Sequence, residues 1–376
     1  MVKTEILIVG GGVAGLSTAY FLGKNGRRSV IVLEQEKSLG GHASGRNAGM
    51  LRQAVPDPVL ARLAKQSRAY FERLRGNGWK RLSLRKQGSL LLAKGSKLGE
   101  LRLIAGALAR VGIPTRWLSH RQVERKVRLL AGGDFSRGLF CPSDAMLELG
   151  PFLSGFLKSL RAMGIRVHKG AALKDVRNTH GGFIVDAGGK KYFAENIVNA
   201  AGAWASWVAR KAGAMDVPLT AYRRHLYTSP GSGLPVPGFR RWPFVWDVSH
   251  DFYFRPTRQG LLLSPCDKMP EKRGDRREKV HPAMKHALEQ KLRRFSSALG
   301  RLRLGNAKSG LRTMTPDGRF VVGEDPRRKG FYWVAGLGGH GVTTCFSVGR
   351  LAADLILGRR TDQNLRHKLS PRRFLK

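Results

Sequence analysis

The chain has 376 residues, of which 42% are hydrophobic and 25% charged, a composition typical of a folded globular protein rather than a disordered one. Its length predicts about two domains. No apolar run approaches the ~18 residues of a membrane span, and the first residues lack the long apolar core of a secretory signal. Three widely spaced cysteines without a C-x-x-C argue against a disulfide framework and a structural zinc site. We therefore expect a cytoplasmic protein that uses no metal.

The beginning of the chain has the pattern of a nucleotide-binding unit. Residues 5–9 form a short apolar run that predicts a strand buried on both faces of a parallel sheet. The stretch 10–15, GGGVAG, satisfies G-x-G-x-x-G, residues 16–26 predict a helix, and residues 29–33 predict a second strand that closes at Glu34. This order predicts dinucleotide binding, and a glycine-rich turn without a ligand is the alternative.

Each residue type in this motif has a physical reason. Gly10 permits the tight turn, Gly12 lets the backbone approach a pyrophosphate, and Gly15 lets the helix pack closely on the strand. Glu34, 19 residues after Gly15, can accept hydrogen bonds from an adenosine ribose and disfavours a 2′-phosphate. The helix N-terminus offers free N–H groups to the phosphates. The cofactor-binding residues expected from this unit are Gly10, Gly12, Val13, Ala14, Gly15 and Glu34.

A second strand, glycine turn and helix lie near the other end of the chain. Residues 331–335 predict a strand, 336–341 a glycine-rich turn, and 342–357 a helix whose N-terminus would face an electron-rich ligand group. Between the two units, Asp57 and Pro58 are typical of a helix start. Residues 196–204 predict a buried strand that leads through small residues into a helix.

Several of these segments resemble the D-amino-acid oxidase/dehydrogenase superfamily of flavoproteins. The loop GGHASGRNAGM at 40–50, the run VNAAGAW at 198–204 and the run GLRT…DG at 310–318 resemble landmarks of D-arginine-type dehydrogenases and glycine oxidases. The resemblance implies FAD, and Thr-Met-Thr at 313–315, where covalent members have a cysteine, implies that FAD is held non-covalently. The further cofactor contacts that it implies are Gln35, His42, Ala43, Ser44, Arg46, Asn47, Ala48, Gly49, Ala200, Ala201, Gly202, Trp204, Arg312, Gly338, Gly339, His340, Gly341, Val342 and Thr343.

The resemblance also implies a fold and a domain division. The fold class is α/β (α+β overall), with a Rossmann-like FAD-binding domain assembled from discontinuous segments and a smaller antiparallel-sheet substrate domain. The FAD-binding domain is expected to comprise residues 1–80, 145–220 and 310–376. The substrate domain is expected to comprise residues 81–144 and 221–309.

Five residues are candidates for the chemistry. By resemblance, Arg312 pairs with the substrate carboxylate, and its planar fork suits that group. Arg224 resembles a second carboxylate-binding arginine, and the adjacent Arg223 is the alternative for this role. Tyr253 resembles the tyrosine at the substrate. His42 and His340 occur on loops that flank the flavin in relatives, and a structural role is the alternative for both.

These expectations combine into a flavin-dependent oxidative deamination of a small amino acid, such as a D-amino acid or glycine. A 2-hydroxy acid or secondary-amine oxidase is the first alternative. The chain has 68 lysines and arginines against 26 aspartates and glutamates, a net charge of +42. This charge would attract phosphates, so a flavin enzyme that acts on modified tRNA bases is a second alternative. No nucleic-acid motif occurs, however, and a nucleic-acid partner is disfavoured. The expected partners are the amino acid, oxygen or a quinone as electron acceptor, and a peripheral contact with an anionic membrane, expected to be the inner membrane.

Overall fold

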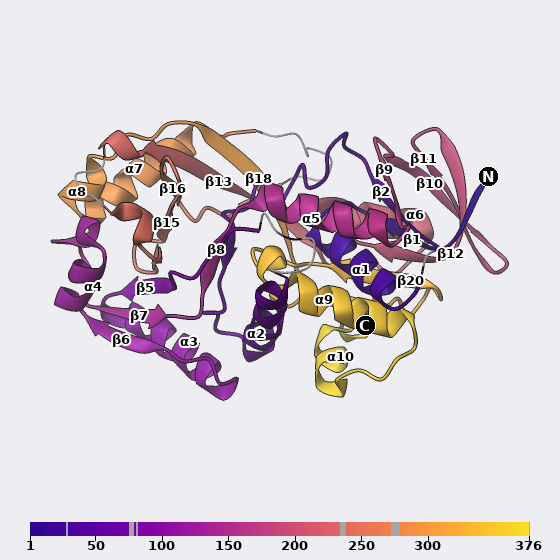
Figure 1. Ribbon diagram of the computed structural model, residues 1–376, viewed down its shortest axis with the longest axis horizontal. Coiled ribbons are helices and arrows are strands. Elements are labelled where there is room, and N and C mark those ends of the chain that lie inside the picture. The colour runs from indigo at the N-terminus through magenta and orange to yellow at the C-terminus, as the bar shows by residue number, and fades with distance from the viewer. Residues whose placement is uncertain (28, 75–78, 80–81, 234–237, 272–278, 376) are drawn as a thin grey trace.

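A computed structural model describes residues 1–27, 29–74, 79, 82–233, 238–271 and 279–375. Two lobes lie side by side along the long axis of the molecule (Figure 1). The lobe that contains the N-terminus is built on a mixed sheet in the order β10-β11-β12-β1-β2-β9, and β20 pairs with β12 and β19. Its strands are β1 (Val2–Val9), β2 (Val30–Glu34), β9 (Arg166–Lys169), β10 (Leu173–Thr179), β11 (Gly182–Ala187), β12 (Lys190–Asn199), β19 (Val321–Glu324) and β20 (Phe331–Ala335).

The apolar run of β1 is buried on both faces, as its composition predicts. Ile6 and Ile8 belong to one core, whereas Leu7 and Val9 belong to the core on the opposite face. The strand runs parallel to β2 and to β12, which is a pairing typical of the centre of such a sheet. The first core is covered by α1 (Val13–Lys24), α2 (Pro58–Arg73), α5 (Leu149–Ala162) and α9 (Gly341–Ile356), and the second by α6 (Ala205–Ala212).

The two ends of the chain meet through α1 and α9, which lie side by side in Figure 1. A Cβ added at Gly349 would lie 2.6 Å from the backbone carbon of Ser17, so the two helices approach more closely than larger residues allow. Asp57 caps α2, because its Oδ1 accepts hydrogen bonds from the backbone nitrogens of Val59 at 2.7 Å and Leu60 at 3.3 Å. The predicted helix start is therefore confirmed. The short helix α10 (Gln363–Leu369) follows α9.

The other lobe contains a large sheet in the order β17-β13-β16-β15-β14-β5-β7-β6, with β18 paired to β13. All of its pairings are antiparallel except the one between β14 and β5. Its strands are β5 (Ser89–Ala93), β6 (Arg116–Ser119), β7 (Arg137–Cys141), β13 (Thr220–Pro230), β14 (Phe244–Asp247), β15 (Phe252–Pro256), β16 (Gly260–Ser264), β17 (Met269–Pro270) and β18 (Ala307–Met314).

Helices cover both faces of this second sheet. Leu101 and Ile104 of α3 (Leu98–Arg110) join the core that continues into the first lobe. The opposite face is covered by α4 (His120–Lys126), α7 (Ala283–Phe295) and α8 (Ser297–Gly300). A small sheet of β3 (Met50–Leu51), β8 (Ala145–Leu147) and β4 (Leu84–Arg85) adjoins both large ones.

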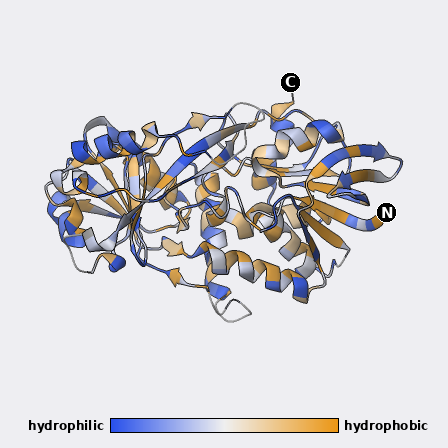
Figure 2. Cartoon of the chain, turned by 90° about the horizontal axis from the view of Figure 1, so that it is seen from above, coloured by the Kyte–Doolittle hydropathy of each residue, from blue (hydrophilic) through white to orange (hydrophobic). Residues whose placement is uncertain are grey.

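The long strand β13 was not predicted, because its mixture of basic, aromatic and polar residues has no regular alternation. It pairs with β18 from Thr220 against Met314 to Tyr227 against Ala307, so the expected domain boundary at residue 310 falls inside β18. Figure 2 shows hydrophobic strands at the centre of each lobe and hydrophilic segments toward the outside. Within the part of the chain that the structure describes, we find no helix with the length and apolar character needed to cross a membrane.

Candidate functional site

A cavity of about 380 Å³ opens where β1, β2, β12 and β20 end and where β18 passes. Its walls consist mostly of small and apolar residues, with a few polar groups. This is the usual composition of a site for a large organic ligand. The lining residues are Val9, Gly10, Gly12, Val13, Ala14, Leu33, Glu34, Gln35, Gly40, Gly41, His42, Ala43, Ser44, Asn47, Ala171, Leu173, Ala200, Ala201, Gly202, Ala203, Trp204, Trp207, Val208, Leu311, Thr313, Val334, Ala335, Gly336, Leu337, Gly338, Gly341 and Val342.

The glycine motif forms the turn between β1 and α1 at one wall of the cavity. Gly10 has φ +118°, and a Cβ there would lie 2.3 Å from the carbonyl oxygen of Ala200. A Cβ at Gly15 would lie 2.0 Å from the carbonyl oxygen of Gly10, so Gly15 serves helix packing and does not line the cavity. Gly12 is the N-cap of α1 and has no side chain to cap the first turn. The Val13 nitrogen donates to Ser44 Oγ at 3.0 Å, and the other N–H groups at the start of the helix can receive an anionic group.

Glu34 stands at the end of β2, in the cavity wall. Its Oε2 accepts a hydrogen bond from the Gly11 nitrogen and its Oε1 one from the Glu36 nitrogen, both at 2.9 Å. Burial raises the pKa of this carboxyl, and the two backbone N–H groups oppose the rise. Each oxygen keeps a lone pair free, so the carboxylate can still accept hydrogen bonds from a ligand hydroxyl.

His42 lies close to Glu34 and not among the arginines with which it was grouped as a candidate for the chemistry. Its Nε2 lies 2.9 Å from Oε1 of Glu36 and 3.2 Å from Nε2 of Gln35. Its ring centre lies 4.6 Å from that of Trp204. These contacts place His42 in the cavity wall near the acidic strand end, and we assign it no step of the reaction.

The opposite wall combines the end of β12, the turn before α9 and strand β18. Leu311 and Thr313 of β18 line the cavity, and Thr313 Oγ1 is buried without a hydrogen-bond partner. Because buried hydroxyl groups normally have a hydrogen-bond partner, this one is a candidate to bind a polar atom of a ligand. His340 precedes α9 as its N-cap residue and provides no side-chain cap. The cradle of glycines, the acid of β2 and this unpartnered hydroxyl fit a dinucleotide cofactor such as FAD.

Arg312 lies between Leu311 and Thr313 in β18, and its side chain leaves the cavity wall for a second cluster of residues. Its Nη1 comes within 2.9 Å of the Cβ position of Gly339. The pKa of Arg312 is lowered by burial and by the charge of Arg224, whereas Tyr253 opposes that effect. Tyr253 is fully buried, and its hydroxyl has no hydrogen-bond partner.

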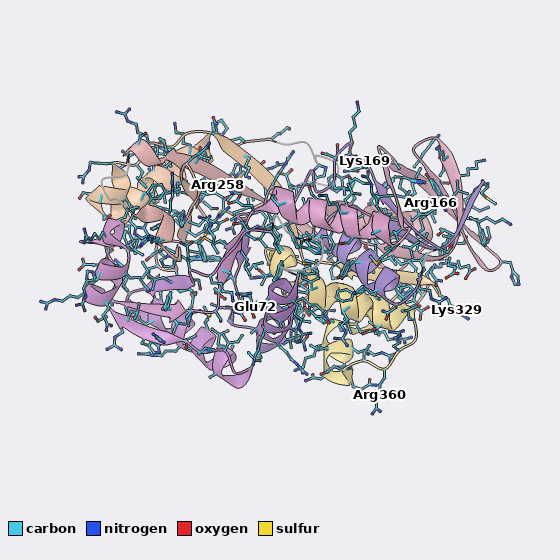
Figure 3. The ribbon with its side chains drawn as sticks, viewed as in Figure 1. Glu72, Arg166, Lys169, Arg258, Lys329 and Arg360 are labelled. Carbon is cyan, nitrogen blue, oxygen red and sulfur yellow. The ribbon has the colours of Figure 1, made fainter. Side chains whose placement is uncertain are left out.

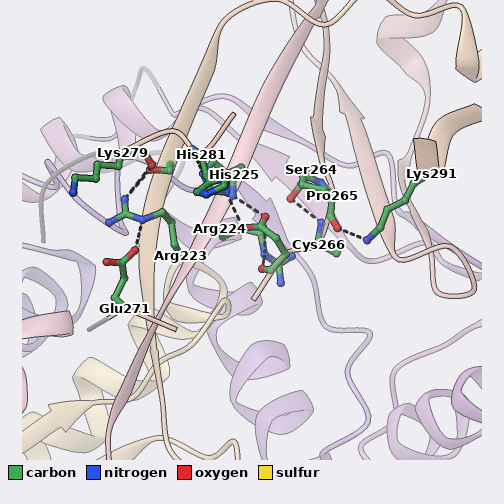
Figure 4. A network of polar contacts seen from close by, with 12 residues as sticks. Arg223, Arg224, His225, Ser264, Pro265, Cys266, Glu271, Lys279, His281 and Lys291 are labelled. Carbon is green, nitrogen blue, oxygen red and sulfur yellow. Dashed lines mark hydrogen bonds and ion pairs between the residues drawn. The ribbon is translucent and has the colours of Figure 1, made fainter. Parts of the chain in front are cut away.

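Arg224 belongs to the same cluster, and Figure 4 shows how it is held. Its Nε donates a hydrogen bond to the carbonyl oxygen of Asp267 at 2.6 Å, and the same nitrogen lies 4.0 Å from Oδ1 of that residue. Its Nη1 is buried without a partner. Arg223, the neighbour that sequence left open, instead contacts Glu271 and donates to Ser309 Oγ at 3.0 Å. We therefore keep Arg224 as the candidate for binding an anion.

The cluster contains two residues that the sequence did not reveal. The guanidinium of Arg52 lies 4.1 Å from the ring centre of Trp246, and Trp246 is the cross-strand partner of Tyr253 with ring centres 5.5 Å apart. Burial lowers the pKa of Arg52 to about 10, so this arginine stays charged at neutral pH. The only signal in the sequence was the position of Arg52 shortly after the loop at 40–50.

His340 borders both the cavity and the arginines. Burial, together with the charges of Arg52 and Arg312, lowers the pKa of His340 to about 3. Its imidazole is therefore neutral at physiological pH and adds no further positive charge to the cluster.

The expected site residues thus fall into two sets. Seventeen of the expected cofactor contacts line the cavity, from Gly10 to Val342. Those placed elsewhere are Gly15, Arg46, Ala48, Gly49, Arg312, Gly339, His340 and Thr343. The lining residues that were not expected are Val9, Leu33, Gly40, Gly41, Ala171, Leu173, Ala203, Trp207, Val208, Leu311, Thr313, Val334, Ala335, Gly336 and Leu337. Most of the latter are apolar or small and have no motif of their own.

Known proteins with similar sequences cover nearly the whole chain. The sequence is 25% identical to glycine oxidase of Geobacillus kaustophilus over 94% of this chain and 93% of that protein. It is 23% identical to 4-methylaminobutanoate oxidase (formaldehyde-forming) of Paenarthrobacter nicotinovorans over 93% of this chain. The chain spans only 43% of the latter and a similar share of several other curated relatives.

The fold is shared with solved structures of the same kind. The crystal structure of glycine oxidase from Geobacillus kaustophilus superposes with a TM-score of 0.87, at 23% identity and over 100% of both chains. The protein family described as "FAD dependent oxidoreductase" (DAO) matches this sequence over residues 5–355, nearly the whole chain. The protein belongs to this family of FAD-dependent oxidoreductases.

Proposed function

We propose that the protein oxidises a small amino acid at the bond between its α-carbon and its nitrogen, with FAD as the cofactor. The observation that carries this proposal is the position of Arg312. It leaves the wall of the cofactor cavity between two lining residues and presents a charged fork next to it. A guanidinium in such a place can fix a carboxylate through two parallel hydrogen bonds.

Different residues of the cavity would bind different parts of the cofactor. The N-terminus of α1 and Ser44 would hold the pyrophosphate, and Glu34 would accept hydrogen bonds from the ribose. Thr313 and the N-terminus of α9 would adjoin the flavin ring, where the helix dipole favours negative charge. When bound, FAD supplies a two-electron acceptor that takes up a hydride.

The chain's own residues bind and orient the substrate. Arg312, with Arg224 and the hydroxyl of Tyr253, would hold the α-carboxylate and so fix the direction of the Cα–H bond. The ammonium group of the substrate would lose a proton to solvent, Cα would lose a hydride to the bound two-electron acceptor, and a C=N bond would form. Water then hydrolyses the imine to a 2-oxo acid and ammonia. His340 is half-buried and neutral at physiological pH, and no proton transfer is assigned to it.

A secondary amine is the second candidate substrate, because 4-methylaminobutanoate oxidase is among the relatives. On such a substrate the same oxidation of a C–N bond releases an amine or an aldehyde instead of ammonia. The residues that hold the carboxylate would be unchanged. The two candidates therefore differ in the space around the nitrogen and not in the arginines.

The test is anaerobic bleaching of the bound flavin with a panel of D- and L-amino acids, glycine, N-methyl amino acids and 2-hydroxy acids. We expect amino acids to bleach the flavin, with one 2-oxo acid and one ammonia formed per flavin reduced. Bleaching by 2-hydroxy acids alone would overturn the proposal. Release of methylamine or formaldehyde in place of ammonia would select the secondary-amine alternative. An aerobic peroxide assay on the active compounds then separates oxygen from a quinone as acceptor.

A further inference from the structure

Three arginines from separate segments converge beside the cofactor cavity. Arg52 follows β3, Arg224 belongs to β13 and Arg312 to β18. The backbone nitrogen of Arg52 lies 3.3 Å from Oγ1 of Thr343, just after the turn where Nη1 of Arg312 meets Gly339. Arg312 interacts electrostatically with both other arginines. Like charges held this close together in a buried or half-buried setting are costly unless anions neutralise them.

The acids near this group are already engaged by other partners. Asp144 accepts hydrogen bonds from Ser89 Oγ at 2.6 Å and from the Gln53 nitrogen at 2.8 Å. Asp267 accepts from the nitrogen of His225 at 2.9 Å and lies 2.7 Å from its Nδ1. The charge of Asp144 still favours the charged form of Arg52, but the hydrogen bonds of both carboxylates go to other partners.

The donors of the three arginines remain largely available. Among the described residues, no carboxylate oxygen lies within ion-pairing distance of Arg52 or of Arg312. Arg224 uses its Nε on Asp267 and leaves Nη1 buried without a partner. One carboxylate has two oxygens and binds one guanidinium fork well. Three forks therefore provide more donors than a single α-carboxylate can use.

We propose that the substrate carries two anionic groups and is an amine dicarboxylate, such as an amino acid with an acidic side chain or an N-carboxymethyl amino acid. This inference rests on the proposed function and specifies its substrate class. The α-carboxylate binds Arg312 and Tyr253, and the second carboxylate binds Arg52. Arg224, whose charge acts on Arg312 and whose Nη1 is buried without a partner, would add a donor for the first carboxylate.

The setting of Arg52 suits this task. The Trp246 ring holds the guanidinium by cation–π stacking at 4.1 Å, which leaves the N–H groups at its edge for a ligand. The net charge of +42 would also draw a doubly charged anion toward the protein faster than a singly charged one. Figure 3 shows labelled cations on both lobes, for example Arg258 on one and Lys169 and Lys329 on the other, so the attraction is not confined to one patch.

The first experiment measures binding without turnover. Unreactive succinate, malonate, propionate and acetate are titrated into the holoenzyme, and the perturbation of the flavin absorbance gives each Kd. We expect the dicarboxylates to bind about 10-fold to 100-fold more tightly than the monocarboxylates, the gain of one charge-assisted pair. Added salt should weaken the dicarboxylates more. Equal affinities for the two classes would overturn the proposal.

Variants then locate the second carboxylate. Arg52→Met should reduce the dicarboxylate-to-monocarboxylate affinity ratio by about tenfold, and Arg52→Lys should restore part of it. Arg258→Met, which removes an exposed arginine, is the matched control and should leave the ratio unchanged. An unchanged ratio in Arg52→Met would remove Arg52 from the proposal. Flavin content and Tm are measured for every variant, and the wild-type comparison stands even if Arg52→Met does not fold.

Kinetic measurements with amine substrates distinguish failure of this inference from failure of the proposed function. With amine dicarboxylates, Arg52→Met should raise KM about tenfold or more with a smaller change in kcat, since the group binds away from the reacting bond. Flavin reduction by monocarboxylate amines in preference to dicarboxylates would refute this inference and leave the proposed function intact. A dicarboxylate preference in binding, with no amine able to reduce the flavin, would refute the proposed function alone.

Discussion

The cofactor cavity and the arginine cluster adjoin each other but are built in opposite ways. The cavity is shaped by backbone, because Gly10 and Gly12 remove side chains where a ligand must approach. The cluster is built from long side chains on three segments, and Arg52 and Arg224 are each close enough to Arg312 for their charges to interact with it. Adding a side chain to the glycine turn should therefore impair cofactor binding, whereas removing a side chain from the arginine cluster should impair binding of an anion. The predictions below use this difference.

The largest effect is expected at the glycine turn. Gly10→Ala places a Cβ 2.3 Å from the Ala200 carbonyl in a backbone with φ +118°, so β1 and β12 must separate at the cavity wall. We expect purified Gly10→Ala to retain almost no FAD, measured by absorbance at 450 nm after gel filtration. The control is Gly150→Ala, because a Cβ at Gly150 meets nothing within 4 Å. Full flavin occupancy in Gly10→Ala would show that the turn does not shape the site.

Removal of the central charge in the cluster should have the next largest effect. Arg312→Met deletes the fork that would hold the α-carboxylate and leaves the cavity lining unchanged. We expect kcat/KM on the best amino acid to fall at least ~100-fold, since a lost bidentate charge pair costs a few kcal/mol. Flavin content should stay close to that of the wild type. A variant that kept more than a third of the wild-type kcat/KM would rule out this role, and Arg258→Met provides the control for a lost surface charge.

A smaller effect is expected at the acid of the cavity. Glu34→Gln keeps the size of the side chain but replaces one acceptor oxygen by an NH₂ group that opposes the Gly11 or Glu36 nitrogen. We expect the Kd for FAD to rise about tenfold, the loss of a hydrogen bond to a charged acceptor. Equilibrium dialysis of the apoprotein with FAD measures it. The control is Glu5→Gln, which removes a carboxylate from a surface ion pair with Arg27 and should leave the Kd for FAD unchanged.

The contrast between the two regions also explains what the sequence could reveal. The strand, glycine turn, helix and acid of the cradle are consecutive, and each step has a local physical requirement, so β1, α1, β2 and Glu34 were all predicted. The second glycine turn and α9 were predicted for the same reason, with α9 found at Gly341–Ile356. The apolar lining residues such as Leu173 and Trp207 were not, because apolar residues occur at many positions without binding a ligand.

The cluster could be predicted only where a resemblance marked a residue. Arg312 was expected from its run at 310–318, whereas Arg52 was one arginine in a chain with 68 lysines and arginines. Its importance depends on β3 passing close to the start of α9 and on Trp246 reaching it from β14. These are contacts over long sequence distances that no local pattern encodes. The role of His42 in the reaction stays a prediction, and only the fold shows that it lines the cavity and contacts Glu36.

The smallest effect concerns His340, which lies at the border of the two regions. Its pKa is about 3 in the folded protein, lowered by burial and by two arginines, against an ordinary value of 6.5. Between these values the unfolded chain binds a proton that the folded chain does not, so His340 makes stability fall as the pH drops below 6.5. His340→Gln removes this dependence. We expect the loss of Tm between about pH 6.5 and 4.5 to be smaller than in the wild type by about 2–4 °C. Differential scanning calorimetry of both holoproteins measures it, with the exposed His286→Gln as control. If His340→Gln and the wild type lost Tm in parallel over this range, the imidazole would not be held neutral by burial and by the two arginines.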